Sequence, residues 1–225
     1  MSVTYTEQAD AADYYAKGKS YWENIPPTLD GMLGGHTSVL KADVQASSRF
    51  ISVFIQDKEN PVGTNQALDC GCGIGRVTKH FLLKHFQNVD MVEQNKTFLD
   101  AADDYLDQDA KRVTRKFNSG LQDFVPDENY YDVIWIQWVI GHLTDDDLIS
   151  FLKRCQRGLK KNGIIVIKDN VSSCDVDTDH LDGSVTRPAQ NLRQLFSDAG
   201  VKILLERKQV KFPKVLYEVK MFALR

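Results

Sequence analysis

The order of apolar and polar positions divides the chain into a helical beginning and a longer part in which strands alternate with helices. Residues 6–24 and 47–56 have helical patterns, and a Pro-Pro pair at 26–27 ends the first helix because proline lacks the amide hydrogen that a helix needs. The segment 29–35, LDGMLGG, carries three glycines and is expected to be a loop. Residues 1–60 are therefore predicted to form a helical cap on a larger domain.

After the polar stretch 57–66, predicted strands alternate with predicted helices. The run YDVIWIQ is almost continuously apolar, which is typical of a strand buried on both faces of a parallel sheet. The strands are expected at residues 67–70, 88–92, 115–118, 131–137 and 164–168, and the helices at 76–85, 97–106, 145–159 and 192–199. Gly163 and Gly200 are expected to end the last two of these helices.

The tail alternates apolar and polar residues over 201–206 and 216–223, as a solvated antiparallel pair of strands does. Together these elements predict an α/β, Rossmann-like fold, in which a doubly wound seven-stranded sheet carries a C-terminal antiparallel hairpin and an N-terminal helical extension. Residues 61–225 are predicted to form this domain and to pack with the cap as one compact unit.

Composition and charge narrow the possible partners. The net charge of −3, from 28 basic and 31 acidic residues, gives no general attraction to phosphate backbones, so nucleic acid is not an expected partner. No apolar run approaches the length that spans a membrane, and the first residues lack the regions of a secretory signal. Cys70, Cys72, Cys155 and Cys174 show no CxxC or metal-ligand spacing. We expect an intracellular protein, cytoplasmic or nuclear, without a metal site; its oligomeric state stays open, and a monomer is compatible with the sequence.

The strongest local motif is DCGCGIGR at residues 69–76, between a predicted strand and a predicted helix. Glycines at alternate positions let the backbone approach a ligand closely, with the helix N-terminus beyond them. A dinucleotide fingerprint would have a further glycine where this chain has Arg76. The loop resembles motif I of the class I S-adenosylmethionine-dependent methyltransferases. That resemblance implies that Gly71, Gly73 and Arg76 hold the methionine end of the cofactor.

Other candidate cofactor residues follow the later strands. Glu93 ends the second strand, where an acid accepts both ribose hydroxyls in nucleotide sites. The resemblance to class I methyltransferases assigns Leu121 and Gln122, after the third strand, to the adenine. Gln137 closes the fourth strand, at the edge where open α/β sheets bind ligands. Trp22 and its flanking helices are expected to close over the cofactor.

Longer segments resemble one family, the protein N-terminal methyltransferases that act on Xaa-Pro-Lys (or Arg) termini. The matching segments are YW (21–22), IPPT (25–28), DGMLGG (30–35), ALDCG (67–71), GIGR (73–76), VDMV (89–92), GLQDF (120–124), YDVIWIQWVIGHLTD (131–145), NGIIVIKDN (162–170) and FALR (222–225). The resemblance spans almost the whole chain. It implies S-adenosylmethionine-dependent methylation of a protein's α-amino group, giving mono-, di- or trimethylated termini and S-adenosylhomocysteine.

The chemistry needs a proton acceptor, because a free α-amino group has a pKa of roughly 7.7–8.0 and is mostly protonated at neutral pH. His142 lies just past the fourth strand, on the ligand-binding edge, and an imidazole can take a proton near pH 7. The family resemblance implies that Asp182 is the second member of this catalytic pair.

The resemblance also assigns residues that bind the peptide. Asn170 is expected to hydrogen bond the terminal residue, and Trp138 to pack against the second-position proline and the amine, where a cation–π contact contributes about 0.5–2 kcal/mol. Leu33 and Gly34 are expected to border the peptide channel, and Tyr217 to line it.

The segment DVDTDHLD after the fifth strand contains four aspartates and no lysine or arginine. Such a run is usually a solvated loop, but here the acidity suits a basic peptide. The family comparison points to Asp179 and Asp182, with Ser184 nearby, as partners of the third-position Lys or Arg. Asp175 and Asp177 are expected only to be exposed to solvent or to steer the substrate.

Two departures from the family stand out. Relatives commonly continue the first glycine segment as LGGYGH, whereas residues 33–39 here read LGGHTSV. The family resemblance therefore does not determine the width of the peptide entrance in this chain. Cys72 replaces a small alanine in the glycine loop, and neither it nor Cys70 is given a nucleophilic role.

Three other functions remain as alternatives. A methyltransferase for small amines or RNA would share the cofactor site, but an RNA enzyme should show a basic, aromatic-rich face. A non-catalytic S-adenosylmethionine-binding module is disfavoured by the presence of His142 and Asp182. An NAD-dependent oxidoreductase is disfavoured by Arg76 in the glycine motif.

Overall fold

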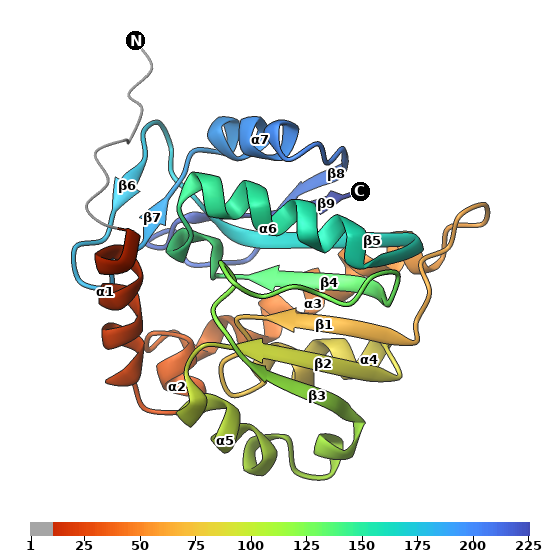
Figure 1. Cartoon of the computed structure of the whole chain (residues 1–225), viewed down its shortest axis with the longest axis horizontal. Coiled ribbons are helices and arrows are strands. Elements are labelled where there is room, and N and C mark those ends of the chain that lie inside the picture. Colours follow the sequence, from red (N-terminus) through yellow and green to blue (C-terminus); the bar gives the residue numbers. More distant parts are fainter. Residues whose placement is uncertain (1–10) are drawn as a thin grey trace.

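The structure, a computed structural model, describes residues 11–225, so the expected helical residues 6–10 lie outside it. Its centre is a seven-stranded sheet in the order β3-β2-β1-β4-β5-β9-β8 (Figure 1). The strands are β1 Gln66–Cys70, β2 Asn88–Glu93, β3 Val113–Asn118, β4 Tyr131–Gln137, β5 Leu159–Val171, β8 Ile203–Lys208 and β9 Glu218–Leu224. The pairs among β1 to β5 are parallel, and β9 is antiparallel to both β5 and β8. The predicted doubly wound fold with a C-terminal antiparallel pair is confirmed.

Helices cover both faces of the sheet, which explains the continuous apolar runs in the sequence. Val133 and Trp135 of β4 belong to a core cluster on one face, and Ile134 and Ile136 to a cluster on the other. The first cluster is covered by α3 (Leu40–Ile55), the π-helical segment η2 (Thr78–Leu82) with α4 (Leu83–His85), and α5 (Lys96–Leu106). The second is covered by α6 (Asp145–Gly158) and α7 (Ala189–Asp198). Since a strand with two buried faces has no solvated positions, β4 shows no alternation.

Two expectations about the N-terminal part were wrong. The second helix, α3, begins at Leu40 rather than at residue 47, because its polar Asp43 lies on the buried face, where the apolar pattern gives no signal. The segment 29–35 is not entirely a loop: α2 (Leu29–Met32) forms one helical turn, and the hydroxyl of Thr28 accepts a hydrogen bond from the Gly31 N–H to cap it.

The C-terminal part also differs from expectation in two places. The helix α6 ends at Gly158, so Gly163 does not terminate it and lies within β5. The strand β9 is not solvated, because it is paired on both sides and Met221 to Leu224 are buried. Gly200 does end α7, with a φ of +76°.

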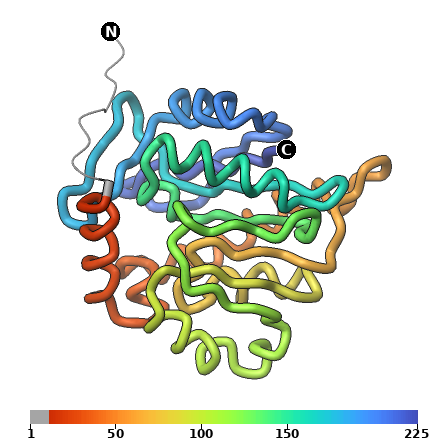
Figure 2. The backbone as a smooth tube through the Cα atoms, in the orientation of Figure 1, coloured from red at the N-terminus to blue at the C-terminus, as the bar shows by residue number. Residues whose placement is uncertain are grey.

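The carboxyl edge of the sheet, at the left of Figure 1, is where the remaining elements gather. They are α1 (Ala11–Glu23), α2, the 3₁₀ turns η1 (Thr37–Val39) and η4 (Ile140–His142), and the short pair β6 (Asp177–Thr178) and β7 (Val185–Thr186). A third 3₁₀ segment, η3 (Asp107–Arg112), connects α5 to β3. Figure 2 shows α1 beside the β6–β7 segment, and Lys17 packs against Gly183 there. The strand order reverses between β1 and β4, and open α/β sheets bind ligands at such a point. None of the helices described over residues 11–225 combines the length and apolarity needed to cross a membrane.

Candidate active site

The glycine loop leaves β1 in a conformation that requires glycine. Gly71 has a φ of +64° and Gly73 a φ of +55°, and a β-carbon on Gly71 would lie only 2.6 Å from Cγ2 of Val139. The carboxylate of Asp69 is used locally, since it accepts hydrogen bonds from the N–H (3.0 Å) and the hydroxyl (2.6 Å) of Thr78. Burial raises the pKa of Asp69 to about 6. The loop therefore offers a ligand its backbone surface, while Asp69 holds the loop to the helix that follows.

Glu93, at the end of β2, holds the other side of the loop. One carboxylate oxygen accepts a hydrogen bond from the Gly73 N–H (3.0 Å) and the other from the Asn95 N–H (2.9 Å). Burial raises the pKa of Glu93, and the hydrogen bonds from Asn95 and Gly73 work against that rise. Each oxygen keeps a further lone pair, so the carboxylate can still accept hydrogen bonds from a ligand.

A cavity of about 460 Å³, including the part open to solvent, lies between these loops and α1. Four predicted cofactor residues, Gly71, Glu93, Leu121 and Gln122, line it, together with Tyr14, Tyr15, Gly18, Val92, Gln94, Ser119, Gly120, Val139, His142 and Leu143. An acid, an apolar side chain, an amide and exposed glycine backbone thus meet in one space. These are the groups that a ribose and an adenine require.

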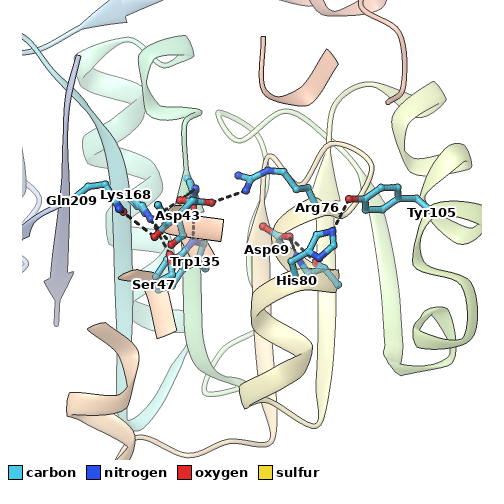
Figure 3. A network of polar contacts seen from close by, with 12 residues as sticks. Asp43, Ser47, Asp69, Arg76, His80, Tyr105, Trp135, Lys168 and Gln209 are labelled. Atoms are coloured by element: carbon cyan, nitrogen blue, oxygen red, sulfur yellow. Dashed lines mark hydrogen bonds and ion pairs between the residues drawn. The ribbon is translucent and has the colours of Figure 1, made fainter. Parts of the chain in front are cut away.

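The other four predicted cofactor residues do not line this cavity. Gly73 and Trp22 are each hydrogen bonded to a residue that does line the cavity: the Gly73 N–H donates to Glu93, and the Trp22 indole N–H donates to His142. Nη1 of Arg76 donates to Asp43. The side-chain NH₂ of Gln137 donates to Asp43 and its side-chain oxygen accepts from the indole N–H of Trp135, so both ends of the Gln137 amide are engaged inside the protein. Figure 3 shows Arg76 reaching from the glycine loop toward Asp43.

His142 sits on η4, directly after β4, and the backbone of this turn is held from two sides. Oδ2 of the buried Asp169, at the end of β5, accepts hydrogen bonds from the N–H groups of Val139 (3.1 Å) and Ile140 (3.2 Å). The buried Arg187 donates to the carbonyls of Ile140 (3.0 Å) and Leu143 (2.6 Å). Burial raises the pKa of Asp169 to about 6. The sequence analysis did not identify Asp169 or Arg187, although the KDN end of a buried strand marks the first.

The imidazole of His142 is arranged as a proton acceptor. Its Nε2 accepts a hydrogen bond from the indole N–H of Trp22 (3.0 Å), which places the lone pair on Nε2 and the proton of the neutral ring on Nδ1. Oδ2 of Asp182 lies 3.8 Å from the same Nε2. Burial lowers the pKa of His142, while the charges of Asp182 and Asp179 oppose this shift. The ring is therefore neutral near pH 7, with carboxylates nearby that favour its protonated form.

Trp138 has an unusual backbone conformation beside this turn. Its φ is +54°, a region that bulky residues rarely occupy. The guanidinium of Arg76 lies 5.1 Å from the indole ring centre, and the ring of Phe212 lies 6.3 Å away on the β8–β9 connection. The indole N–H is buried and has no hydrogen-bond partner within the described residues. Trp138 thus lies between the predicted cofactor side and the C-terminal strands.

A second, acidic cavity of about 690 Å³, including the part open to solvent, adjoins the His142 turn. Five predicted substrate residues, Asn170, Asp179, Asp182, Ser184 and Tyr217, line it, together with Asp177, Thr178, His180 and Thr186. Asp177 is exposed, as expected, and in addition it lines the cavity and accepts a hydrogen bond from the hydroxyl of Tyr217. Asp175 is exposed and does not line the cavity.

Leu33 and Gly34 end the α2 turn and line neither cavity. Leu33 is buried, and Gly34 is exposed with a φ of +52°. Over residues 11–225, no three His, Cys, Asp or Glu side chains are grouped as ligands of a metal ion.

Comparison with known proteins identifies a family whose sequences match this chain. Residues 10–225 match the family described as AdoMet (S-adenosylmethionine) dependent proline di-methyltransferase. The N-terminal Xaa-Pro-Lys N-methyltransferase 1 of Rattus norvegicus is 50% identical over 216 residues, which cover 96% of this chain and 97% of the relative. The Homo sapiens protein of the same name is 49% identical with the same coverage.

Solved structures agree with the sequence relatives. A SAM-dependent methyltransferase from Leishmania major is similar with a TM-score of 0.88 at 36% identity, over 94% of this chain and 83% of that one. The 1,6-didemethyltoxoflavin-N1-methyltransferase of Burkholderia thailandensis, solved with S-adenosylhomocysteine, has a TM-score of 0.68 at 18% identity, over 96% of this chain and 90% of that one, and shows the shared fold alone. Because the family match covers nearly the whole chain, this protein belongs to the AdoMet-dependent proline di-methyltransferase family.

Proposed function

We propose that this protein transfers methyl groups from S-adenosylmethionine to the α-amino group of protein N-termini that begin Xaa-Pro-Lys or Xaa-Pro-Arg. The observation that carries the proposal is the contact between His142 and Asp182. His142 lines the first cavity and Asp182 the second, and Nε2 and Oδ2 are 3.8 Å apart. A proton acceptor therefore lies where the cavity lined by Gly71 and Glu93 meets the acidic one.

The first cavity fits the cofactor in its chemistry. When bound, the cofactor supplies a methyl group on a positively charged sulfur, which a neutral amine can attack. Glu93 has lone pairs left for the ribose hydroxyls, while Leu121 and Gln122 offer an apolar wall and an amide to the adenine. We assign Gly71, Gly73 and Arg76 to the methionine end. Trp22, hydrogen bonded to His142, would close the site beside the reacting groups.

We assign the removal of the amine proton to His142. Nε2 carries the lone pair and is bonded to the Trp22 N–H in this structure, so the amine must displace that contact to reach it. As His142 becomes protonated, the carboxylate of Asp182 stabilises the imidazolium. Positioning and deprotonation of the amine are then the main contributions of the chain to the rate.

The second cavity supports a peptide substrate with a basic third residue. Asp177, Asp179 and Asp182 are three carboxylates in one cavity, and they repel a polyanion such as RNA while attracting a lysine or arginine side chain. Asn170 and Tyr217 are placed to bind the peptide's polar groups. Trp138 would contact the proline at the second position. Leu33 and Gly34 remain our assignment for the outer border of the channel.

A variant at Asp179 tests this recognition. In Asp179→Asn, the KM for a Ser-Pro-Lys peptide is expected to rise by about five- to tenfold, because a partly exposed ion pair contributes roughly 1 kcal/mol. The KM for a peptide with uncharged norleucine at the third position should be unchanged by the same variant. Steady-state kinetics with both peptides measure the two effects.

The matched control is Asp175→Asn, which removes the same charge from the same acidic segment outside the cavity. It should leave both KM values within about twofold, since exposed charges are screened by salt. If Asp179→Asn affected the two peptides equally, or if wild-type protein did not turn over the lysine peptide, the proposed recognition would be wrong.

A further inference from the structure

A buried charged cluster lies next to the cofactor side of the site, and two of its members, Asp43 and Lys168, have been given no role above. Asp43 of α3 bonds Arg76 through one carboxylate oxygen (2.6 Å), while the other pairs with Lys168 of β5 (2.5 Å) and accepts from Gln137 (2.9 Å). Lys168 also donates to the Asp43 carbonyl and to the hydroxyl of Ser47, both at 3.0 Å. Figure 3 shows this arrangement, with Asp43 between the two cations.

The cluster is almost completely removed from water. Lys168 is 0% exposed, Asp43 2% and Arg76 5%. In such surroundings an unbalanced charge is costly, and here a single carboxylate faces two cations. The nearby Asp69 forms no direct bond with Arg76: its Oδ2 accepts both hydrogen bonds from Thr78, and it interacts with Arg76 only through charge, which opposes the rise of the Asp69 pKa on burial. With all three side chains ionised, the hydrogen-bonded group of Asp43, Arg76 and Lys168 therefore holds one more positive charge than negative charge.

The unused donors of Arg76 indicate where the missing negative charge belongs. Nη1 donates to Asp43, and over residues 11–225 no hydrogen bond joins Nε or Nη2 to a protein oxygen. A guanidinium has five N–H groups and binds carboxylates in pairs of bonds. If Asp43 faced Arg76 alone, its two oxygens could both turn to the guanidinium. Lys168 and Gln137 hold one oxygen away, so part of the guanidinium stays available.

We propose that Lys168 is a positioning residue for cofactor binding, which by sharing Asp43 with Arg76 keeps the guanidinium free to bind the carboxylate of the cofactor's methionine end. The proposal rests on the proposed function, because it takes S-adenosylmethionine as the cofactor. Lys168 itself does not touch the ligand. Its effect is transmitted through Asp43, so it depends on the ligand's negative charge and on Arg76.

The test compares two ligands that differ in that charge. S-adenosylhomocysteine has the amino-acid carboxylate, and 5′-methylthioadenosine has the same nucleoside and sulfur without the amino-acid end. In Lys168→Met, which keeps all but the last atom of the side chain's length and removes the charge, calorimetric titration should show about tenfold weaker binding of S-adenosylhomocysteine. The affinity for 5′-methylthioadenosine should stay within about twofold of wild type.

Two further variants separate this role from a structural one. In an Arg76→Ala background, Lys168→Met should cause no additional loss of S-adenosylhomocysteine affinity, because the two residues act on the same ligand group. The control is Lys160→Met, which removes the other ion-paired lysine of β5, bound to Asp132 (3.1 Å), and should change neither affinity. Lys168→Gln, which keeps a hydrogen-bond donor, serves as the second neutral variant if Lys168→Met does not fold.

Equal weakening of both ligands, no weakening of either, or an additive loss in the Arg76→Ala background would overturn the role of Lys168. Those results would leave the proposed function intact, provided that wild-type protein binds S-adenosylhomocysteine. Failure of the wild-type protein to bind that ligand would instead refute the proposed function itself, and the two failures are distinguishable in one set of titrations.

Discussion

Replacement of His142 by alanine is expected to lower kcat by about 100-fold or more at pH 7, the range of a lost general base. The affinity for S-adenosylhomocysteine should change far less, because the side chain is only one of many that line the cofactor cavity. The effect is large because most α-amino groups are protonated at neutral pH and must lose that proton before they react. Nε2 of His142 carries the lone pair that we assign to accept it.

The effect should depend on pH in a definite direction. Burial lowers the pKa of His142 below its ordinary 6.5, so the wild-type imidazole stays a base through neutral pH. Below roughly pH 7.7, where most α-amino groups are protonated, wild-type protein can then bind the charged amine and deprotonate it. The alanine variant can use only the fraction of amine that is already neutral. The difference between the two enzymes is expected to be largest below about pH 7.5 and to shrink above about pH 8.

Kinetics from pH 6 to 9, with titrations of S-adenosylhomocysteine on both proteins, measure these quantities. His85→Ala is the control, because His85 is also half-buried with a lowered pKa but is hydrogen bonded to Ser48, away from both cavities. Equal losses of turnover and cofactor affinity, or a deficit that does not vary with pH, would contradict the base role of His142.

Gly71→Ala should be the most damaging single change on the cofactor side. Its β-carbon would meet Val139 at 2.6 Å, and its backbone would be held at a φ of +64°, which costs a non-glycine residue about 1 kcal/mol. Either the glycine loop or Val139 must move, and both line the cofactor cavity. Overpacking typically costs 1–3 kcal/mol, so S-adenosylhomocysteine binding should weaken by about 5- to 150-fold.

Gly200→Ala separates the steric effect from the backbone effect. Gly200 has a φ of +76°, but no atom lies within 4 Å of the β-carbon that alanine would add. The Gly200→Ala substitution should lower the melting temperature, because alanine is strained at this positive φ, while the affinity for S-adenosylhomocysteine stays unchanged. If Gly71→Ala lost stability by the same amount but bound S-adenosylhomocysteine normally, the glycine loop would not be part of the cofactor site.

The centre of the sheet could be predicted from the sequence because β4 and the middle of β5 are buried on both faces and so read as nearly unbroken apolar runs, whereas β3 has exposed residues at alternate positions. The prediction of α3 was less successful for the opposite reason. Its inner face carries Asp43 and Ser47, which are buried through polar contacts, and an apolar pattern has no means of detecting them. The tail was misread as solvated because β9 gains a second neighbour, β5, that is distant in sequence.

Much of the candidate site was also predictable, but unevenly. Asn170, Asp179, Asp182, Ser184 and Tyr217 were identified by family resemblance, and the structure brings them to one cavity. Residues that act through partners were missed: Asp169 and Arg187 hold the His142 turn by contacts to its backbone. Such contacts depend on long-range packing: only Asp169 has a local signal, its place in the KDN segment near the end of a buried strand, and Arg187 has none. The positions of Arg76 and Gln137 were not predictable either, because they depend on Asp43.

The account depends most on which atom receives the methyl group. Purified protein incubated with S-adenosylmethionine and a Ser-Pro-Lys peptide should add mass in 14 Da steps, the mass of one CH₂ per transfer, and tandem mass spectrometry should place every step on the α-nitrogen. N-acetylated and Ser-Ala-Lys peptides should gain little or nothing. A methyl group found on the lysine side chain, or a free Xaa-Pro-Lys terminus left unchanged while another substrate is modified, would contradict the account.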